Sequence, residues 1–489
     1  MAKSIMLQGT MSNVGKSFLT AALCRILKQD GYSVAPFKSQ NMALNSFITL
    51  DGAEIGRAQA LQAEAAGIEP TAMMNPILLK PTTDIGSQVI VNGKVRGNMR
   101  AADYFRHKKE LIPDIKRAYD TLSEQYDIIV IEGAGSPVEL NLKADDIVNM
   151  GLAEIVNSPV LLVGDIDRGG VFAQLIGTLE LLESYERERV KGLVVNKFRG
   201  DISLFQNGIE ILENRSGTKV AGVIPYIECD IEDEDSLSDK LNAKAKNGLV
   251  DIAVIRLPKI SNFTDFDVFE QYEGVAVRYV TSARELEKPD MVILPGTKST
   301  IADMHWLNEC GLSSEIKRLY NEGTPVFGIC GGYQLMGREI SDPCNSECGG
   351  SISGLGLLDC KTVFSDEKKQ TQVTGRFRKI DGFFSFLTEA EFYGYEVHMG
   401  VTECNGAELT DCGGSFSRNA AGCYVHGLFD SAQVSGIIVK ELLKRKNVAF
   451  TGTPTDRKVY RNIQLDLLAE NVRKNLDMKL IYRIIEEGI

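Results

Sequence analysis

Residues 9–17 of the chain read GTMSNVGKS, and they follow an apolar run at residues 5–7 and precede a helical pattern at residues 18–28. Glycines and exposed backbone N–H groups at the start of a helix form a binding site for phosphate groups. Lys16 can reach the β- and γ-phosphates of a nucleotide, and the hydroxyl of Ser17 can bind magnesium. The order of strand, loop and helix therefore predicts a P-loop domain that binds ATP and Mg²⁺.

The spacing of the glycines departs from the commonest P-loop pattern. That pattern places a glycine where this chain has Thr10, and the glycine falls one residue earlier, at Gly9. This longer loop resembles that of dethiobiotin synthetase, an enzyme that phosphorylates a carboxylate or carbamate. A simple glycine-serine turn is the alternative, but the Gly-Lys-Ser sequence argues against it. The loop residues predicted to bind nucleotide are Gly9, Thr10, Asn13, Val14, Gly15, Lys16 and Ser17.

A carboxylate that follows a buried strand is a candidate for the magnesium site. Glu132 ends the apolar run at residues 128–131 and precedes residues 133–135, which read GAG. At the carboxyl edge of a parallel sheet, this side chain would face the nucleotide. Glu132 on its own could also be an ordinary surface acid, so the candidate depends on the neighbouring P-loop.

Length and composition indicate a globular protein with more than one domain. The chain has 489 residues, of which 44% are hydrophobic and 25% are charged, and its net charge of −12 disfavours binding to nucleic acid or anionic membranes. The sequence has no apolar stretch of the roughly 18 residues that cross a bilayer, and no signal peptide. We therefore expect a cytoplasmic protein with small-molecule partners, whose ten cysteines are thiols.

Short apolar runs that alternate with helical patterns predict two α/β domains with parallel sheets. Residues 1–230 form the predicted P-loop NTPase-like domain, and residues 251–445 form the second domain. The polar, partly acidic stretch at residues 231–250 predicts a linker, because it offers little to bury. Apolar positions in residues 446–489 have amphipathic spacing and predict a helical extension.

A second motif surrounds Cys330, in residues 326–334, which read VFGICGGYQ. A tight turn between strand and helix exposes the thiol, glycines admit a substrate, and the start of the helix favours the thiolate. We interpret Cys330 as a nucleophile. A buried structural cysteine is the alternative, but a strained, glycine-rich turn is a costly way to bury a thiol.

A nucleophilic thiol needs a base, and the chain has four histidines: His107, His305, His398 and His426. His426 lies where an apolar strand meets a turn, so it could take the proton of Cys330 and later protonate the leaving ammonia. His398 is the rival, and it could instead line the site. Residues 295–298 read PGTK and predict an oxyanion loop, in which the backbone N–H groups of Gly296 and Gly331 face the tetrahedral intermediate.

The cysteine turn and the later histidine together resemble a class I glutamine amidotransferase domain. This resemblance implies a flavodoxin-like α/β fold that releases ammonia from glutamine. Many members carry a glutamate two positions after the histidine, where this chain has Leu428. The departure matches the branch that contains cobyric acid synthase and cobyrinic acid a,c-diamide synthase, and it leaves open what orients His426.

The two predicted activities fit one reaction. A carboxylate is a poor acyl donor, whereas an acyl phosphate loses its phosphate readily, so ATP can activate an acid that ammonia then converts to an amide. Each amide would consume one ATP and one glutamine. Because water competes with ammonia for the acyl phosphate, a shielded path for ammonia is expected.

Segments over nearly the whole chain resemble the cobyric acid synthase family. They are residues 38–42, 54–60, 75–81, 132–137, 145–151, 165–170, 196–201 and 260–265. The resemblance implies amidation of the b, d, e and g carboxylates of adenosylcobyrinic acid a,c-diamide. It further implies that Asn196 binds the nucleotide, that Asp51 binds magnesium, and that Gln40, Asn41 and Asp146 contact the corrin or the acyl phosphate. It leaves the oligomeric state open, including a homo-oligomer.

Other functions remain open from the sequence. Cobyrinic acid a,c-diamide synthase shares both domain types, although residues 40–41 and 54–60 favour the family that carries out four amidations. A partitioning or regulatory ATPase shares the altered P-loop, but it usually has a lysine where this chain has Met11, and it needs no Cys330. A glutamine-binding module with a dead site conflicts with the intact cysteine and histidine. Cys344 and Cys348 could bind zinc, although no second pair accompanies them.

Overall fold

The computed structural model describes residues 2–83, 86–231, 248–452 and 454–489 and divides into two compact units. The first unit comprises Met1–Met42, Ala53–Ile231 and Arg461–Ile489, and the second comprises Ala43–Gly52 and Glu232–Tyr460. Of the predicted linker at residues 231–250, residues 232–247 lie outside the described part of the chain.

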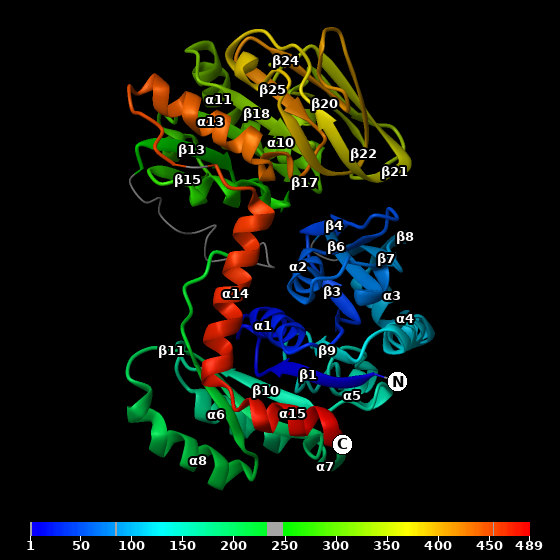
Figure 1. The fold of residues 1–489 in the computed structure, drawn as a ribbon. Coiled ribbons are helices and arrows are strands. Elements are labelled where there is room, and N and C mark those ends of the chain that lie inside the picture. The colour runs from blue at the N-terminus through cyan, green and yellow to red at the C-terminus, as the bar shows by residue number, and fades with distance from the viewer. Residues whose placement is uncertain (1, 84–85, 232–247, 453) are drawn as a thin grey trace. The chain divides into compact units, whose positions relative to one another are not determined.

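The first unit is built on a six-stranded parallel sheet in the order β12-β11-β10-β1-β9-β2 (Figure 1). The strands are β1 (Lys3–Gly9), β2 (Val34–Phe37), β9 (Ile128–Glu132), β10 (Val160–Asp165), β11 (Val190–Phe198) and β12 (Val220–Pro225). Helices of this unit include α1 (Lys16–Gln29), α2 (Arg57–Ala66), α4 (Ile112–Gln125), α5 (Met150–Ile155), α6 (Val171–Leu181), α7 (Ser184–Arg187) and α8 (Gln206–Ser216).

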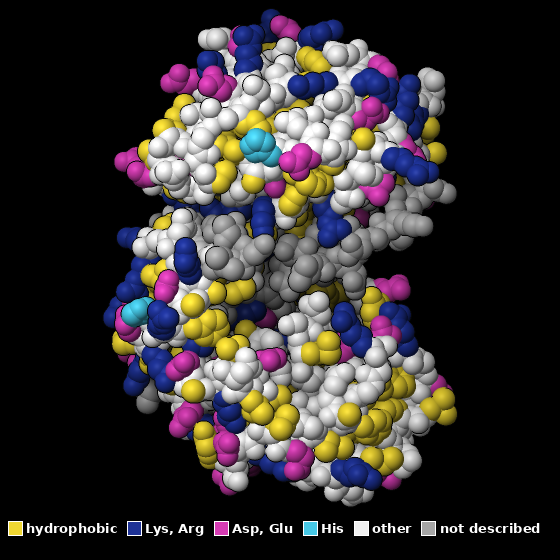
Figure 2. Space-filling model, turned by 180° about the vertical axis from the view of Figure 1, so that it is seen from behind, with side chains coloured by type: hydrophobic (Ala, Val, Ile, Leu, Met, Phe, Trp, Pro, Cys, Tyr) yellow, Lys and Arg dark blue, Asp and Glu magenta, His cyan; other side chains and the backbone are white. Residues whose placement is uncertain are grey.

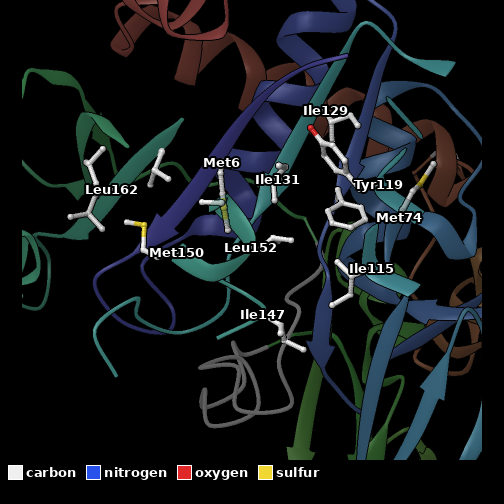
Figure 3. Close-up of a cluster of buried hydrophobic side chains, with 14 of the residues drawn as sticks. Met6, Met74, Ile115, Tyr119, Ile129, Ile131, Ile147, Met150, Leu152 and Leu162 are labelled. Carbon is white, nitrogen blue, oxygen red and sulfur yellow. The ribbon is translucent and has the colours of Figure 1, made fainter. Parts of the chain in front are cut away.

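Alternate residues of each strand in this sheet face opposite hydrophobic cores, as the period of a strand requires. Met6, Ile129 and Ile131 pack with residues of α4, α5 and α6 in one core. Figure 3 shows part of this core, including Ile115 of α4 and Met150 of α5. Ile5 and Val130 face the other core, which contains residues of α1. The continuous apolar runs in the sequence are explained by this burial on both faces.

A smaller sheet in the order β3-β6-β7-β8 completes the N-terminal part of the first unit. Its elements are β3 (Gln40–Met42), β6 (Ile77–Thr83), β7 (Gly86–Val91) and β8 (Lys94–Arg100), with β5 (Glu54–Gly56) and α3 (Ala101–His107) nearby in the sequence. Strand β4 (Ser46–Ile48) lies in the segment that belongs to the second unit.

The end of the chain belongs to the first unit. Helix α14 (Arg457–Asn475) is followed by α15 (Met478–Glu487), which lies beside β1 in Figure 1. Leu465 and Val472 are fully buried in the core that contains α1, and Arg25 of α1 pairs with Asp466 at 2.7 Å. The helical pattern predicted for residues 446–489 therefore includes helices that cover one face of the P-loop unit.

The second unit is built on a seven-stranded sheet in the order β15-β13-β16-β18-β25-β24-β23, in which the first five strands are parallel. The strands are β13 (Val250–Ile255), β15 (Val275–Val280), β16 (Met291–Leu294), β18 (Val326–Ile329), β23 (Glu408–Thr410), β24 (Gly413–Ser417) and β25 (Ala420–Cys423). Its helices include α9 (Ala283–Leu286), α10 (Thr300–Glu309), α11 (Leu312–Asn321), α12 (Gly331–Met336) and α13 (Ala432–Arg445). The prediction of two α/β domains with parallel sheets is confirmed.

A second sheet of this unit has the order β20-β19-β21-β22. A disulfide within it shows that the prediction of ten cysteine thiols was wrong. Its strands are β19 (Glu339–Asp342), β20 (Gly350–Ser353), β21 (Cys360–Arg376) and β22 (Glu391–Cys404). Cys360 and Cys404 are opposite each other in the antiparallel pair β21–β22 and form a disulfide. Eight of the ten cysteines are thiols, rather than all ten as expected. Partners that are 44 residues apart in sequence become neighbours only through strand pairing.

The surface carries charges of both signs. Figure 2 shows Lys and Arg side chains interspersed with Asp and Glu on the face drawn there. Among the described residues, no helix combines the length and the apolar character that a membrane crossing needs.

Candidate functional site

The predicted phosphate loop connects β1 to α1, and its glycines are required by close packing. A Cβ atom at Gly9 would lie 2.6 Å from Cγ2 of Val14 and 3.0 Å from Nζ of Lys16. Gly15 has a φ of 94° and precedes the first residue of α1, a conformation that favours glycine. Gly9, the glycine that lies one residue earlier than in the commonest P-loop pattern, thus lies where the loop folds over Lys16.

Two residues at the end of β11 hold this loop from the neighbouring side. Nδ2 of Asn196 donates a hydrogen bond of 2.7 Å to the carbonyl of Val14. Nζ of Lys197 donates to the carbonyl of Asn13 and, at 3.0 Å, to Asp165. The structure therefore brings Asn196 to the predicted loop residues. Sequence reasoning missed Lys197, whose positive φ of 60° marks an unusual backbone position that the sequence does not reveal.

Glu132 is the centre of a buried polar network beside the loop. Its Oε1 atom accepts hydrogen bonds of 2.8 Å from the Ser17 hydroxyl and from Nζ of Lys38, and its Oε2 atom accepts one from Nε2 of Gln62. Only 1% of Glu132 is exposed. The two magnesium candidates Ser17 and Glu132 are thus adjacent, and the network adds Lys38 and Gln62. Lys38 could have been identified from the sequence, because it directly follows the buried strand β2.

The network fits a bound magnesium nucleotide. Oε1 of Gln8, Nε2 of Gln59 and Oε1 of Gln62 are buried without a hydrogen-bond partner, which is costly unless a ligand or water supplies one. Hydroxyl and carboxylate oxygens such as those of Ser17 and Glu132 suit Mg²⁺, which usually takes its other ligands from phosphates and water. No cluster of three or more His, Cys, Asp or Glu side chains suitable for a metal occurs in the part of the chain that the structure describes.

The residues predicted to contact the corrin have partners within the first unit. Oε1 of Gln40 accepts a hydrogen bond from the Tyr104 hydroxyl, and Nδ2 of Asn41 donates to Oε1 of Gln59 at 2.9 Å. Both residues belong to β3. This β-strand position fixes their backbone, and the Asn41–Gln59 pair is buried.

Asp146 and Asp51, the other two predicted acids, have different surroundings. The Asp146 carboxylate accepts hydrogen bonds of 2.8–2.9 Å from the backbone N–H groups of Val148, Asn149 and Gly151, so it fixes the turn before and into α5. Asp51 lies in the segment that belongs to the second unit, where the Thr49 hydroxyl donates to it. Within the first unit, the hydrogen bonds of Asp146 therefore connect it with α5 rather than with Ser17 or Glu132.

Cys330 lies at a strained turn between β18 and α12. Its backbone has φ 51° and ψ −110°, which is rare for a residue with a side chain. The turn is tight, because a Cβ atom at Gly332 would lie 1.9 Å from the carbonyl oxygen of Leu294. The Cys330 thiol is 3.6 Å from the carbonyl of Val397, to which it donates. Strand, strained cysteine and helix follow one another as the sequence motif predicts.

His426 is held by a carboxylate that sequence reasoning did not identify. Its Nδ1–H group donates to Oδ2 of Asp265 at 2.7 Å, and the backbone N–H of Gly427 donates to Oδ1 of the same residue. Asp265 belongs to the 3₁₀-helix at Phe263–Gln271. Leu428, at the position where many class I glutamine amidotransferases carry glutamate, is fully buried in the hydrophobic core. Asp265 therefore orients the imidazole in place of that glutamate.

The charge of His426 is set by opposing effects. Burial lowers the pKa of the imidazole, but Asp265 and Cys330 raise it more strongly through charge and hydrogen bonding, so the pKa is raised to about 10. At neutral pH the imidazole therefore keeps a proton. Such a residue can hold the proton that Cys330 gives up and deliver it to a leaving group.

His398, the rival base, is engaged elsewhere. Its Nδ1 atom is 2.8 Å from the carbonyl oxygen of Gly400, and its Nε2 atom is 3.3 Å from Oε2 of Glu396. Its ring is stacked on Tyr424 with centroids 3.7 Å apart. Because both ring nitrogens face oxygen atoms, this geometry favours His426 as the partner of Cys330.

The predicted oxyanion loop lies next to these residues. Strand β17 (Gly296–Thr297) pairs with β14 (Ile260–Ser261), which precedes the 3₁₀-helix of Asp265. A Cβ atom at Gly296 would lie 2.8 Å from Cε1 of His426, and one at Gly331 would lie 2.9 Å from the backbone nitrogen of Thr297. Both predicted oxyanion residues are thus brought to the site, and both need to be glycine.

Comparison with known proteins identifies two family domains in the chain. A family model described as CobQ/CobB/MinD/ParA nucleotide binding domain matches residues 5–238, and one described as CobB/CobQ-like glutamine amidotransferase domain matches residues 251–434. A solved glutamine amidotransferase matches 40% of this chain and 99% of its own at 16% identity, with a TM-score of 0.30, too low to bear on the fold.

Full-length relatives are more informative. Cobyric acid synthase of Lachnoclostridium phytofermentans is 54% identical over 100% of both chains. Cobyric acid synthase of Ruminiclostridium cellulolyticum is 52% identical over 100% of this chain and 98% of its own. Cobyric acid synthase of Clostridium botulinum is 49% identical over 99% of each chain. The similarity thus extends through both units.

Proposed function

The chain belongs to the cobyric acid synthase family, and from this premise we propose how its two sites act in one reaction. The protein is an ATP-dependent, glutamine-hydrolysing ligase that forms amides in cobalamin biosynthesis. We propose that its substrate is adenosylcobyrinic acid a,c-diamide and that the b, d, e and g carboxylates are amidated in turn. One observation carries this proposal: a single chain holds both the Cys330–His426–Asp265 arrangement and a P-loop with Ser17 beside Glu132.

In the glutaminase unit, the thiolate of Cys330 attacks the carboxamide carbon of glutamine and forms a C–S bond. The backbone N–H groups of Gly296 and Gly331 stabilise the oxyanion that develops. When the C–N bond breaks, His426 gives its proton to the leaving ammonia, and water then hydrolyses the thioester to glutamate. The negative charge of Asp265 stabilises the protonated imidazole between these steps.

In the synthetase unit, the phosphate loop and Lys16 bind the phosphates of ATP, and Asn196 contributes to the nucleotide site. An oxygen of the substrate carboxylate attacks the γ-phosphorus of ATP, the bond from that phosphorus to the β–γ bridging oxygen breaks and ADP leaves, and ammonia then displaces phosphate from the acyl phosphate. Lys38 places a positive charge beside Glu132. When bound, magnesium would neutralise phosphate charge, held by Ser17 and Glu132 with Asp51 as a further proposed ligand. Gln40, Asn41 and Asp146 are proposed to line the substrate site.

The mass of the product tests this function. We expect purified protein with ATP, glutamine and the a,c-diamide to give four successive products, each lighter than the previous one by the exchange of an OH group for NH₂. A parallel reaction with cobyrinic acid in place of the a,c-diamide distinguishes this function from that of cobyrinic acid a,c-diamide synthase, which would amidate cobyrinic acid instead. Nucleotide hydrolysis without any amide, from glutamine or ammonium salt, would contradict the proposal and leave a P-loop ATPase.

The substitution Asp265→Asn tests the orientation of His426. Loss of this negative charge should lower glutaminase kcat by on the order of 10²–10³-fold, because the amide can present the wrong group to Nδ1 and cannot stabilise the imidazolium. Since Asp265 raises the pKa of His426, its neutral replacement should lower that pKa and move the alkaline limb of the pH–rate profile to lower pH. Glutamate release measured across pH gives both quantities.

Asp267→Asn provides the matched control, because Asp267 is a buried carboxylate on the same 3₁₀-helix. We expect this variant to keep the wild-type position of the alkaline limb. Amidation with ammonium salt should persist in both variants. An Asp265→Asn protein with wild-type kcat and pH profile would show that Asp265 does not position the imidazole.

A further inference from the structure

Ten residues from the N-terminal half of the chain, Ala43–Gly52, fold as part of the second unit. The strands on either side of this segment in the sequence, β3 and β5, belong to the first unit. Strand β3 carries Gln40 and Asn41, which are proposed to line the substrate site. Segment 43–52 is therefore continuous in the chain with the synthetase unit, while all of its contacts described below are with the glutaminase unit.

Segment 43–52 contacts Tyr395, which packs directly against His426. The Tyr395 hydroxyl donates a hydrogen bond of 2.8 Å to the carbonyl of Ser46, and its ring is 5.4 Å from that of Phe47. The Tyr395 ring is also stacked on the His426 imidazole, with ring centroids 5.5 Å apart. Two backbone hydrogen bonds also join Tyr395 and His426. Tyr395 thus links the segment to the catalytic histidine.

The same segment contacts the strand that holds the Cys330 thiol. Ile48 is fully buried in a small core with Tyr395 and Val397, and its carbonyl accepts a hydrogen bond from Nε2 of Gln372. The carbonyl of Val397 is the acceptor for the Cys330 thiol. Packing of Ile48 therefore fixes the position of β22 at the residue that contacts the nucleophile.

A third contact reaches the turn that carries Asp265. The backbone N–H of Ser46 donates a hydrogen bond of 2.9 Å to Oδ1 of Asn262. Asn262 has a positive φ of 51°, and its carbonyl accepts a hydrogen bond from the backbone N–H of Asp265. Each of the three residues Cys330, His426 and Asp265 is thus linked to segment 43–52 through one intermediate residue.

We propose that segment 43–52 positions the glutaminase residues and couples glutamine hydrolysis to substrate binding in the synthetase unit, with Tyr395 as the principal positioning residue. The coupling rests on the proposed function, since it needs a substrate that binds at Gln40 and Asn41. A ligand that orders β3 restricts the segment that continues from it, and it favours the arrangement in which Tyr395 holds His426. Ammonia is then released mainly when an activated carboxylate can use it.

The substitution Tyr395→Phe tests the coupling, because it keeps the ring beside His426 and removes the hydroxyl that donates to the carbonyl of Ser46. In the wild type, ATP and the a,c-diamide together should increase the rate of glutamate release. In Tyr395→Phe this increase should shrink by about fivefold or more, and the ratio of amide to glutamate should fall below one. Amidation supplied with ammonium salt should continue at the wild-type rate in the same protein.

Two further variants keep the test decisive. Phe47→Ala removes the ring contact from the segment itself and should reduce the increase in the same way. Tyr272→Phe removes another buried hydroxyl of this unit, 2.9 Å from that of Ser435, and should keep the full increase.

The outcomes separate the coupling from the function on which it rests. A wild type that makes no amide from either nitrogen source contradicts the proposed function itself. If the wild type makes amide but substrate does not increase its glutamate release, or if Tyr395→Phe and Phe47→Ala keep the full increase, the coupling is wrong while the function stands. Loss of the increase in Tyr272→Phe as well would also overturn the role of the segment.

Discussion

Replacement of Cys330 by alanine is expected to lower glutamine-dependent amidation by at least about 10³-fold and to leave ammonia-dependent amidation at the wild-type rate. Without the thiol, no C–S bond forms and glutamine keeps its nitrogen, whereas the synthetase residues are unchanged. Release of glutamate and formation of amide, measured with each nitrogen source, report the two halves of the reaction separately.

Cys423→Ala is the matched control for this variant. Cys423 is a fully buried thiol on β25, opposite Ile329 of the strand that leads to Cys330. Burial is the main cause that raises its pKa to about 12, so it stays protonated and cannot act as a nucleophile at neutral pH. We expect Cys423→Ala to keep glutaminase activity. Equal glutamate release by Cys330→Ala and the wild type would refute the assignment of the nucleophile.

The substitution Glu132→Gln is expected to have the complementary effect. Amidation should fall by on the order of 10²–10³-fold with glutamine and with ammonium salt alike, while glutamate release in the absence of acceptor continues. The amide removes the negative charge that Ser17 and Lys38 contact and that the proposed magnesium ion would need, and it breaks the ion pair of the buried Lys38 ammonium. The measurements are ATP-dependent amide formation and glutamate release on the same preparation.

A general loss of stability has to be distinguished from a loss of this site. Glu186→Gln removes another buried carboxylate of the first unit that pairs with a lysine, Lys143, at 2.7 Å. We expect this control to lower the thermal midpoint without the specific loss of amidation. A folded Glu132→Gln protein that amidates at the wild-type rate would show that Glu132 has no part in phosphoryl transfer.

The local motifs of both sites could be predicted from the sequence because their residues are neighbours in the chain. Gly9, Lys16 and Ser17 lie on one loop, and the strained turn at Cys330 depends on adjacent glycines. His426 could also be predicted from the sequence, because the chain has only four histidines that could act as the base. In each case the chemistry needs a local backbone shape, and such shapes leave a pattern in the sequence.

Residues that join a site through tertiary structure left no such pattern. Asp265 lies 161 residues before His426, and only the packing of its 3₁₀-helix brings its carboxylate to the imidazole. Gln62 reaches Glu132 from helix α2 across 70 residues of sequence. The apolar spacing of the last residues predicted a helix, but it could not indicate that the helix from Arg461 onward packs with the first unit.

This return of the chain to the first unit has a consequence for how the protein is made. During synthesis, the N-terminal sheet leaves the ribosome with one face of α1 uncovered, and the helices that bury Leu23, Ile26 and Leu27 are translated only after residue 456. Most of the glutaminase unit, Glu232–Tyr460, is produced in between and can fold as a domain inserted into an unfinished one. An excised N-terminal fragment would expose that apolar face, so the ATP-binding half is not a module that can be separated by one cut.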